Sequence, residues 1–252
     1  MGRHKGQITL LTKPILLVLT IGVLGVLVYS IYTSHSSEKV RESELDLRTT
    51  ATNLLTILAS SEDCLGYVTR ETMSSYANIV DVQKLEEFSD RYADIEPWCA
   101  RSYRYGWRAK VKEMNDMGKP LREWSFGAAN FSKGKALSRG IITNMPIGVK
   151  HSKKDIKPGL LEIEVVDGDL ERVAGFLDMV CEFGRDKGDY LATKSLSIVY
   201  PVYLEGGKLC SGYGSTKACR RLLCEDVRME NINAGSYYLR ARYYNNVLYV
   251  SI

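Results

Sequence analysis

The stretch Tyr103–Val111 reads YRYGWRAKV, and its residues alternate strictly between two kinds of side chain. The odd-numbered positions carry aromatic or aliphatic residues, and the even-numbered ones carry arginine, glycine or lysine. Because successive side chains of a strand point to opposite faces, this period of two predicts a half-buried β-strand. A second strand is predicted at Leu160–Val166, LLEIEVV. The two strands together predict that the body of the chain, residues 61–252, is built on a β-sheet.

Helices and further strands surround these two segments. Helical spacing of apolar residues predicts helices over Val82–Tyr92 and Leu170–Phe183. Ser195–Leu204 is rich in β-forming residues, but Pro201 moves it to an edge or a bulge. The last 17 residues predict a hairpin that turns at Asn245-Asn246. Residues 114–159 read as loops with short strands, and a boundary near 130–158 could divide the body into two subdomains.

An uncharged run precedes the body. Pro14–Thr33, PILLVLTIGVLGVLVYSIYT, holds 20 residues without a charge, and as a helix it would span about 30 Å, the thickness of a bilayer core. It is longer than a cleaved signal's apolar stretch and has no clear small-residue cleavage site. We therefore expect a retained transmembrane helix, with a cleaved signal peptide as the less favoured alternative.

The stretch that follows the uncharged run, residues 34–60, predicts an amphipathic helix. Its apolar residues follow helical spacing, whereas charged residues fill much of its remaining surface. One continuous helix from about residue 10 to about residue 60 is the simplest interpretation, and a break near Ser34–Ser37 is the alternative. The expected fold class is therefore α+β, with a long N-terminal helix followed by an antiparallel-sheet head, 61–252, with one or two packed helices.

The distribution of charge indicates topology. Arg3, Lys5 and Lys13 give the first 13 residues a basic tail, and the remainder of the chain is nearly neutral. The positive-inside rule places this tail in the cytoplasm and the head outside the cell membrane. A basic folded face, which nucleic-acid binding needs, is not predicted, so nucleic acid is not an expected partner.

Six cysteines follow the uncharged run: Cys64, Cys99, Cys181, Cys210, Cys219 and Cys224. An even number in an exported head predicts disulfides, although free thiols of a cytosolic domain and a zinc site are the alternatives. From proximity in sequence we expect Cys64 to pair with Cys99 and the other four to pair among themselves.

The sequence shows no catalytic constellation, so we expect no enzyme and no cofactor or metal. His151 is the only histidine of the head that could serve as a general acid or base, and a surface loop residue is the simpler interpretation. Glu162 and Glu164 share a strand face and are expected to meet solvent. Asn130 begins the only N-x-S/T sequon, a possible N-glycosylation site.

The N-terminal layout resembles that of archaeal type IV pilins with a class III signal peptide. The matching residues are Lys5, Gly6 and Gln7, and the resemblance implies a prepilin leader, 1–6, that a prepilin peptidase would remove between Gly6 and Gln7. It further implies other pilin-like subunits as partners in a surface filament. The family usually carries glutamate at the fifth position of the mature chain. Leu11 stands there in this sequence, which favours a minor or accessory subunit.

Two functions follow. The first is a membrane-anchored surface protein that resembles a minor or accessory pilin and has a structural or interaction role. The second is a single-pass membrane protein whose extracytoplasmic head binds a partner and never polymerises. No ligand of the head is predicted from the sequence.

Overall fold

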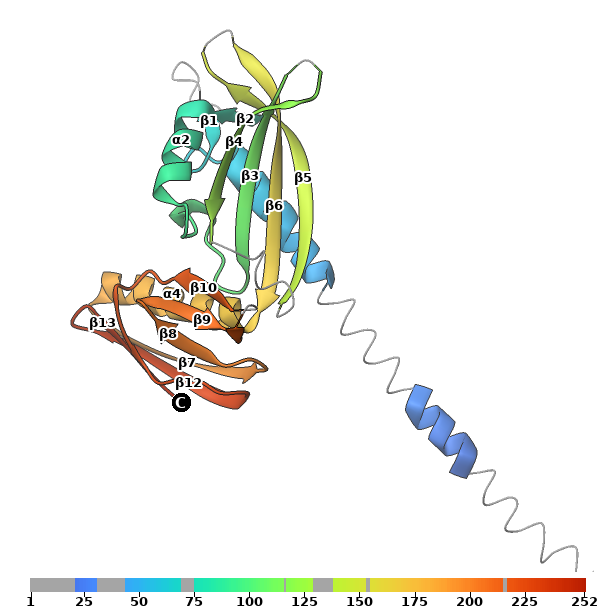
Figure 1. Cartoon of the computed structure of the whole chain (residues 1–252), viewed down its shortest axis with the longest axis vertical. Coiled ribbons are helices and arrows are strands. Elements are labelled where there is room, and N and C mark those ends of the chain that lie inside the picture. Colours follow the sequence, from blue (N-terminus) through green and yellow to red (C-terminus); the bar gives the residue numbers. More distant parts are fainter. Residues whose placement is uncertain are drawn as a thin grey trace, which may run out of the picture. The chain divides into compact units, whose positions relative to one another are not determined.

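The computed structural model describes residues 21–30, 44–68, 75–115, 117–128, 138–152, 155–214 and 217–252. The chain divides into two compact units, Met1–Asp46 and Leu47–Ile252. In the first unit, residues 21–30 form a helix whose side chains are all exposed. The boundary between the units lies within a helix whose described residues are 44–60. The second unit contains the rest of this helix and all the remaining elements (Figure 1).

The long N-terminal helix expected from the sequence is a wrong prediction. The described helical residues in that region are 21–30 and 44–60, and none of the described helices has both the length and the apolar character needed to cross a membrane. The physical difference between the two segments is packing. Helix 44–60 buries an apolar stripe in the head, whereas every side chain of helix 21–30 is exposed.

A six-stranded sheet forms the first half of the second unit, with the order β1-β2-β5-β6-β3-β4. All its pairings are antiparallel except that of β2 with β5, which is parallel. The elements of this half are β1 (Gly66–Val68), β2 (Ser75–Asp81), α2 (Val82–Arg91), η1 (Trp98–Ala100), β3 (Gly106–Met114), β4 (Pro120–Gly127), β5 (Ser138–Lys150) and β6 (Ile156–Gly168).

The inner face of this sheet and helix 44–60 make the first core, whose buried residues lie between Leu47 and Val165. Trp107, Ala109 and Val111 of β3 are fully buried, so the alternation of this stretch is the signal of a half-buried strand. The Trp107 ring packs edge-on against Phe126, and its Nε1–H donates to the Ala100 carbonyl at 3.0 Å. Burial and a satisfied polar group together fix this aromatic centre.

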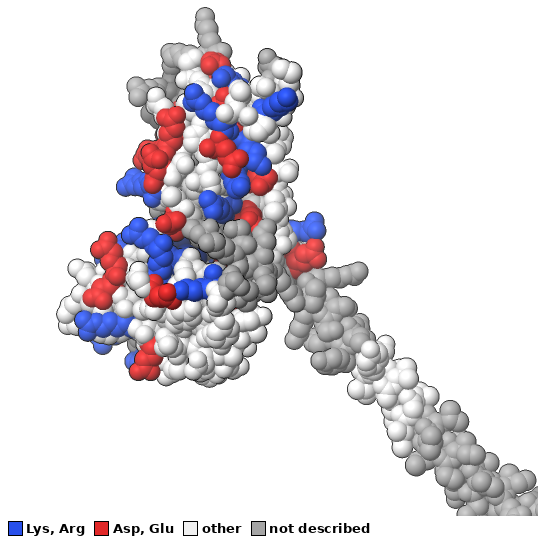
Figure 2. Space-filling view, in the orientation of Figure 1, with Lys and Arg blue, Asp and Glu red and all other residues white. Residues whose placement is uncertain are grey.

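The outer face of the sheet carries charged residues of both signs (Figure 2). Lys112 of β3 pairs with Glu162 of β6 at 3.3 Å, and Lys110 pairs with Glu123 of β4 at 3.6 Å. These cross-strand pairs follow directly from the even positions of the β3 alternation, which point away from the core.

The second half is built around one helix, α4 (Asp169–Lys187), which packs against two further sheets. Buried residues occur on several faces of α4, among them Leu170, Val173 and Val180, so this helix lies inside the second core. The buried residues of that core lie between Leu170 and Val250. The sheets have the orders β11-β13-β12-β7 and β10-β9-β8. Their strands are β7 (Asp189–Ile198), β8 (Val202–Glu205), β9 (Lys208–Ser211), β10 (Ala218–Arg221), β11 (Asp226–Met229), β12 (Gly235–Tyr244) and β13 (Val247–Ser251).

Two further expectations need correction. Residues 114–159 are not mainly loops, because β4 and the long hairpin of β5 and β6 occupy most of that range. The sheets are also not purely antiparallel, since β2 pairs in parallel with β5 and β11 with β13. The glycine and polar residues of these strands have a low local propensity for β-structure, so the sequence pattern did not predict them. The strands are stabilised by long-range pairing instead. The buried residues of the first core end at Val165 and those of the second core begin at Leu170, where β6 meets α4.

Local turn chemistry agrees with the structure. Asn245 and Asn246 have φ of 50° and 63° and join β12 to β13, as a tight hairpin of primed type requires. The predicted strand over Ser195–Leu204 splits at Val199–Pro201 into β7 and β8. The β7 pairing ends at Ile198 because the backbone N–H groups of Val199 and Tyr200 donate to Asp169 Oδ2 of α4, at 2.7 and 2.8 Å, instead of to a strand.

The two cores meet where α4 crosses the segment 96–104, which leads into β3. Gly175 of α4 touches the backbone of Tyr103 so closely that a Cβ atom at Gly175 would lie 2.4 Å from the Tyr103 carbonyl oxygen. The missing side chain therefore lets the helix approach the 96–104 segment.

We expect Gly175→Ala to destabilise the chain by about 1–2 kcal/mol, because overpacking outweighs the gain in helix propensity. Thermal unfolding monitored by circular dichroism measures the change. Asp186→Ala, at an exposed position of the same helix, is the control and should change stability little. A rise in the melting temperature of the Gly175 variant would contradict the close approach.

Candidate functional site

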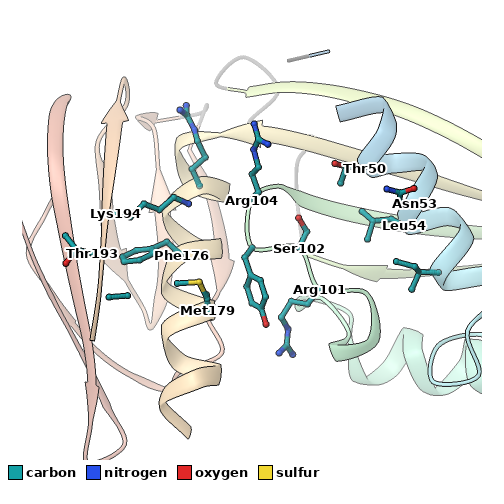
Figure 3. Close-up of a pocket in the computed structure, with 14 residues that line it drawn as sticks. Thr50, Asn53, Leu54, Arg101, Ser102, Arg104, Phe176, Met179, Thr193 and Lys194 are labelled. Carbon is teal, nitrogen blue, oxygen red and sulfur yellow. The ribbon is translucent and has the colours of Figure 1, made fainter. Parts of the chain in front are cut away.

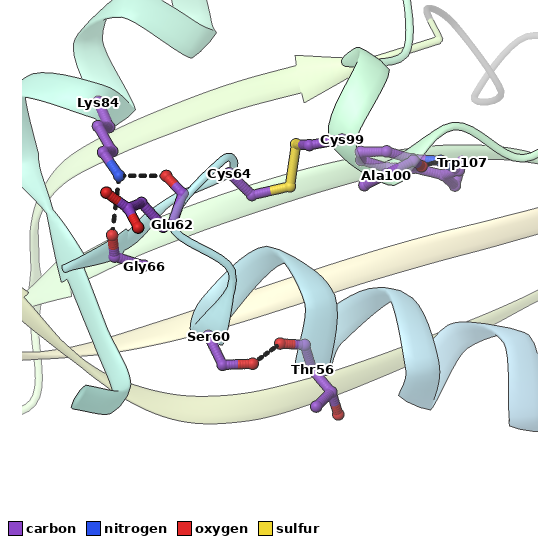
Figure 4. The surroundings of a disulfide bond; sticks show 9 residues. All are labelled: Thr56, Ser60, Glu62, Cys64, Gly66, Lys84, Cys99, Ala100 and Trp107. Carbon is purple, nitrogen blue, oxygen red and sulfur yellow. Dashed lines mark hydrogen bonds between the residues drawn. A yellow bond between two sulfur atoms is a disulfide. The ribbon is translucent and has the colours of Figure 1, made fainter. Parts of the chain in front are cut away.

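Three disulfides join all six cysteines and tie together the elements near the junction of the cores. Cys64 pairs with Cys99, as expected from the sequence, and so links the turn after helix 44–60 to η1 (Figure 4). Cys181 of α4 pairs with Cys224. Cys210 and Cys219 face each other across β9 and β10.

The turn after helix 44–60 is also held by hydrogen bonds. Lys84 Nζ of α2 donates to the carbonyls of Glu62 at 2.5 Å and of Gly66 at 2.9 Å. Within the helix, the Ser60 hydroxyl donates to the Thr56 carbonyl (Figure 4). The disulfide and these contacts fix the end of the helix relative to the 96–104 segment.

A buried arginine joins the two cores. Arg220 of β10 is 3% exposed, and its Nη2 donates to Asp178 Oδ2 of α4 at 2.7 Å. Its Nη1 lies 3.9 Å from Glu96 Oε1 in the first core. Glu96 in turn accepts from the backbone N–H groups of Ser102 and Trp107, so one charge network reaches from the second core to the root of β3.

Burial dominates the titration of the acids around Arg220. It raises the pKa of Glu96 to about 7, although the charge of Arg220 acts in the opposite direction. The pKa of Glu171, near the start of α4, is likewise raised to about 7 by burial. These carboxyl groups therefore titrate near neutral pH.

A groove of about 730 Å³ lies at this junction (Figure 3). Helix 44–60 forms one wall, α4 and β7 form the other, and the 96–104 segment lies between them. The volume is in the range of sites for small organic ligands. The lining residues are Thr50, Asn53, Leu54, Ile57, Arg101, Ser102, Tyr103, Arg104, Arg172, Phe176, Met179, Ala192, Thr193 and Lys194.

Arg101 and Arg172 of the groove are paired with carboxylates. Arg101 lies 2.8 Å from Glu182, whose carboxylate also accepts from the Tyr103 hydroxyl. Burial and the bond to Glu182 raise the pKa of Tyr103 to about 12, which keeps its proton in place. Arg172 Nη2 donates to Asp169 at 2.9 Å, and its Nε lies 3.4 Å from Asp167.

Lys194 differs from these arginines. It lies on the inward face of β7, in line with the buried Leu196 and Ile198, and its ammonium group lies 5.8 Å from the centre of the Phe176 ring. Among the described residues, no carboxylate pairs with it. Burial and the nearby charges of Arg104 and Arg172 hold the pKa of Lys194 below its usual value.

The lining of the groove suits the binding of a small molecule. The groove combines the apolar side chains of Leu54, Ile57, Phe176 and Met179 with the cation Lys194, and this combination is typical of a site for a molecule with an apolar body and a negative group. Within the described ranges, no group of three His, Cys, Asp or Glu residues could hold a metal ion.

The residues singled out by the sequence lie elsewhere. His151 Nε2 contacts Glu113 Oε2 at 2.8 Å, and Lys157 contacts the other oxygen at 3.1 Å. Although burial acts to raise the pKa of Glu113, the bonds from Lys157 and His151 lower it. This group joins the β5–β6 hairpin to β3 and does not line the groove. Gly6, Gln7 and Asn130 lie outside the described residues.

Sequence reasoning missed the groove. Lys194 lies in the pattern Tyr190, Ala192, Lys194, Leu196, Ile198, in which a lysine interrupts an inward face. The predicted strand began at Ser195 and so left out Lys194. The alternation continues back to Asp189, and over that longer stretch it indicates an inward-facing lysine. The arginines of the 96–104 segment carry no sequence signal, because only packing against α4 brings them to the site.

Comparison of the chain with protein-family models, curated proteins and solved structures gives no match. The groove, the disulfides and the sequence are therefore the features that indicate a function.

We expect Arg220→Leu to destabilise the fold by about 3–5 kcal/mol, because Asp178 would remain buried without its cation. Denaturant unfolding measures the loss. Arg221→Leu is the matched control, since the neighbouring side chain on β10 is exposed. Equal effects of the two substitutions would contradict the role of Arg220.

Glu171 should make stability fall as pH rises. Its pKa is about 7 in the folded chain against an ordinary 4.5, so between these values the folded state binds more protons than the unfolded state. The free energy of unfolding should therefore decrease from about pH 5 to about pH 8. Glu171→Gln should reduce that decrease by up to about 3 kcal/mol.

Urea unfolding at several pH values measures this slope. Glu87→Gln, which changes an exposed carboxylate of α2, should leave the slope as it is. A Glu171 variant with the wild-type slope would show that this carboxyl group is ionised in the folded chain.

Proposed function

We propose that this chain is a surface protein whose disulfide-bonded head, held at the membrane by the N-terminal segment, binds a ligand in the groove between its cores. The observation that carries the binding role is the groove itself, because its apolar and cationic side chains come together from four separate elements. Ligand sites commonly form at such junctions between packed parts of a fold.

The disulfides support a location of the head outside the cytoplasm, in an oxidising compartment. All six cysteines are paired, and disulfides of this kind persist outside the cytoplasm. The uncharged run Pro14–Thr33 and the basic residues that precede it support attachment to the membrane with the head outside. Membrane lipid is thus the one partner proposed besides the ligand.

A second candidate is an accessory subunit similar to archaeal type IV pilins. The sequence Lys5-Gly6-Gln7 ahead of the uncharged run favours it, and Leu11 at the fifth mature position favours an accessory over a major subunit. Prepilin peptidase and other pilin-like subunits would then be partners.

We expect the native protein to carry three intact disulfides and a head accessible from outside the cell. Alkylation without reduction, followed by peptide mapping, should find no free thiol and the pairs 64–99, 181–224 and 210–219. A membrane-impermeant amine reagent applied to intact cells should label the exposed Lys119 and Lys208. Free thiols, or labelling that requires lysis, would contradict an extracytoplasmic head.

The amino terminus of the native protein separates the two candidates. Mass spectrometry that finds a chain beginning at Gln7 supports prepilin-type processing, because cleavage after Gly6 is specific to that leader. A chain beginning at Met1 or Gly2 contradicts the pilin-like candidate and leaves the binding protein. A chain that begins near residue 33 contradicts membrane attachment by either route.

A further inference from the structure

The cations of the groove differ in whether a carboxylate pairs with them, and this difference indicates the chemistry of the ligand. Of its four cations, Arg101 and Arg172 are each bound to carboxylates of the second core and its border. Lys194 has no carboxylate partner among the described residues, and it is placed on an inward strand face where a neutral residue would be expected. Lys194 is half-buried there, so its ammonium group has lost part of its hydration and an opposite charge beside it would be favourable.

The surroundings of Lys194 strengthen this point. Arg104 and Arg172 are close enough that their positive charges oppose its protonation. Figure 3 shows Lys194 reaching from β7 toward the side of the groove where Arg104 lies. An anion bound there would relieve the repulsion and would accept charge-assisted hydrogen bonds.

Apolar side chains line the groove as well. Ile57 of helix 44–60 lines it and is 40% exposed, although helix 44–60 buries its apolar stripe in the core, and Phe176 and Met179 of α4 also line it. A ligand with an apolar body would cover this surface and gain from its burial. An inorganic anion would leave it exposed to water.

We propose that the groove binds a small amphipathic organic anion, whose carboxylate or phosphate contacts Lys194 and Arg104 and whose apolar body lies between helix 44–60 and α4. This inference rests on the proposed function, because it assumes that the groove is the ligand site. It names the ligand class, which the proposed function leaves open.

Isothermal titration calorimetry of the full chain in nanodiscs of uncharged lipid tests the proposal, with empty nanodiscs as the reference. The probes are 4-phenylbutyrate and 4-phenylbutyl phosphate, which share one apolar body and differ in the anionic group. The neutral 4-phenylbutanol keeps the body without the charge, and acetate and inorganic phosphate keep the charge without the body. The tighter of the two phenylbutyl anions identifies the preferred anionic group.

We expect both phenylbutyl anions to bind more tightly than the alcohol or the small anions, and less tightly at high salt. Lys194→Met should weaken the anions by about tenfold or more and leave the alcohol unchanged, whereas Lys194→Arg should retain binding. Lys208→Met removes an exposed lysine at the start of β9 and should have no effect. Near-ultraviolet circular dichroism verifies that each variant is folded.

Three outcomes would overturn the proposal, and they differ in what else they affect. If the alcohol binds as tightly as the anions, the ligand class is wrong and the groove remains a binding site. If Lys194→Met binds the anions as the wild type does, the anion does not contact Lys194. If Ala192→Phe, which narrows the groove, changes the binding of no probe, or if no probe binds, the binding role of the groove fails as well.

Discussion

Arg220 lies buried between Asp178 of α4 and Glu96 of the first core, and the arrangement of the two cores depends on this contact. A buried guanidinium requires its carboxylates, so the three residues fix one position of α4 against the 96–104 segment. Glu96 continues the constraint by accepting from the backbone of Ser102 and Trp107. The close approach of Gly175 to Tyr103 then completes the contact between helix and segment.

The groove is a consequence of that arrangement. Its cations come from α4, β7 and the 96–104 segment, and its apolar surface comes from helix 44–60 and α4. The Cys64–Cys99 disulfide ties the end of helix 44–60 to η1, so that the two walls are held from the side of the first core as well. A site whose walls are fixed in this way loses little conformational entropy when a ligand binds.

The Arg220 network and the groove differ in the sign of the charge that is left without a partner of opposite sign. At the Arg220 network the acids outnumber the base, and burial raises the pKa values of Glu96 and Glu171 to about 7. In the groove, Glu182, Asp167 and Asp169 pair with arginines, no carboxylate among the described residues pairs with Lys194, and burial lowers the pKa of Lys194. The first arrangement is internal to the fold, whereas the second favours an anion from outside.

The sequence by itself determined the elements whose signal is local. The alternation of Tyr103–Val111 predicted β3 from Gly106 onward, although Tyr103–Tyr105 precede the strand. The apolar spacing within 34–60 predicted a helix that includes 44–60, and Asn245-Asn246 predicted a hairpin, because side-chain period and backbone φ are properties of neighbouring residues. Only the tertiary structure decided that β5 and β6 are long strands and that two sheet pairs are parallel. It also decided that Lys194, Arg104 and Ile57 line one groove. These features arise from contacts between residues far apart in the chain, which a local pattern does not encode.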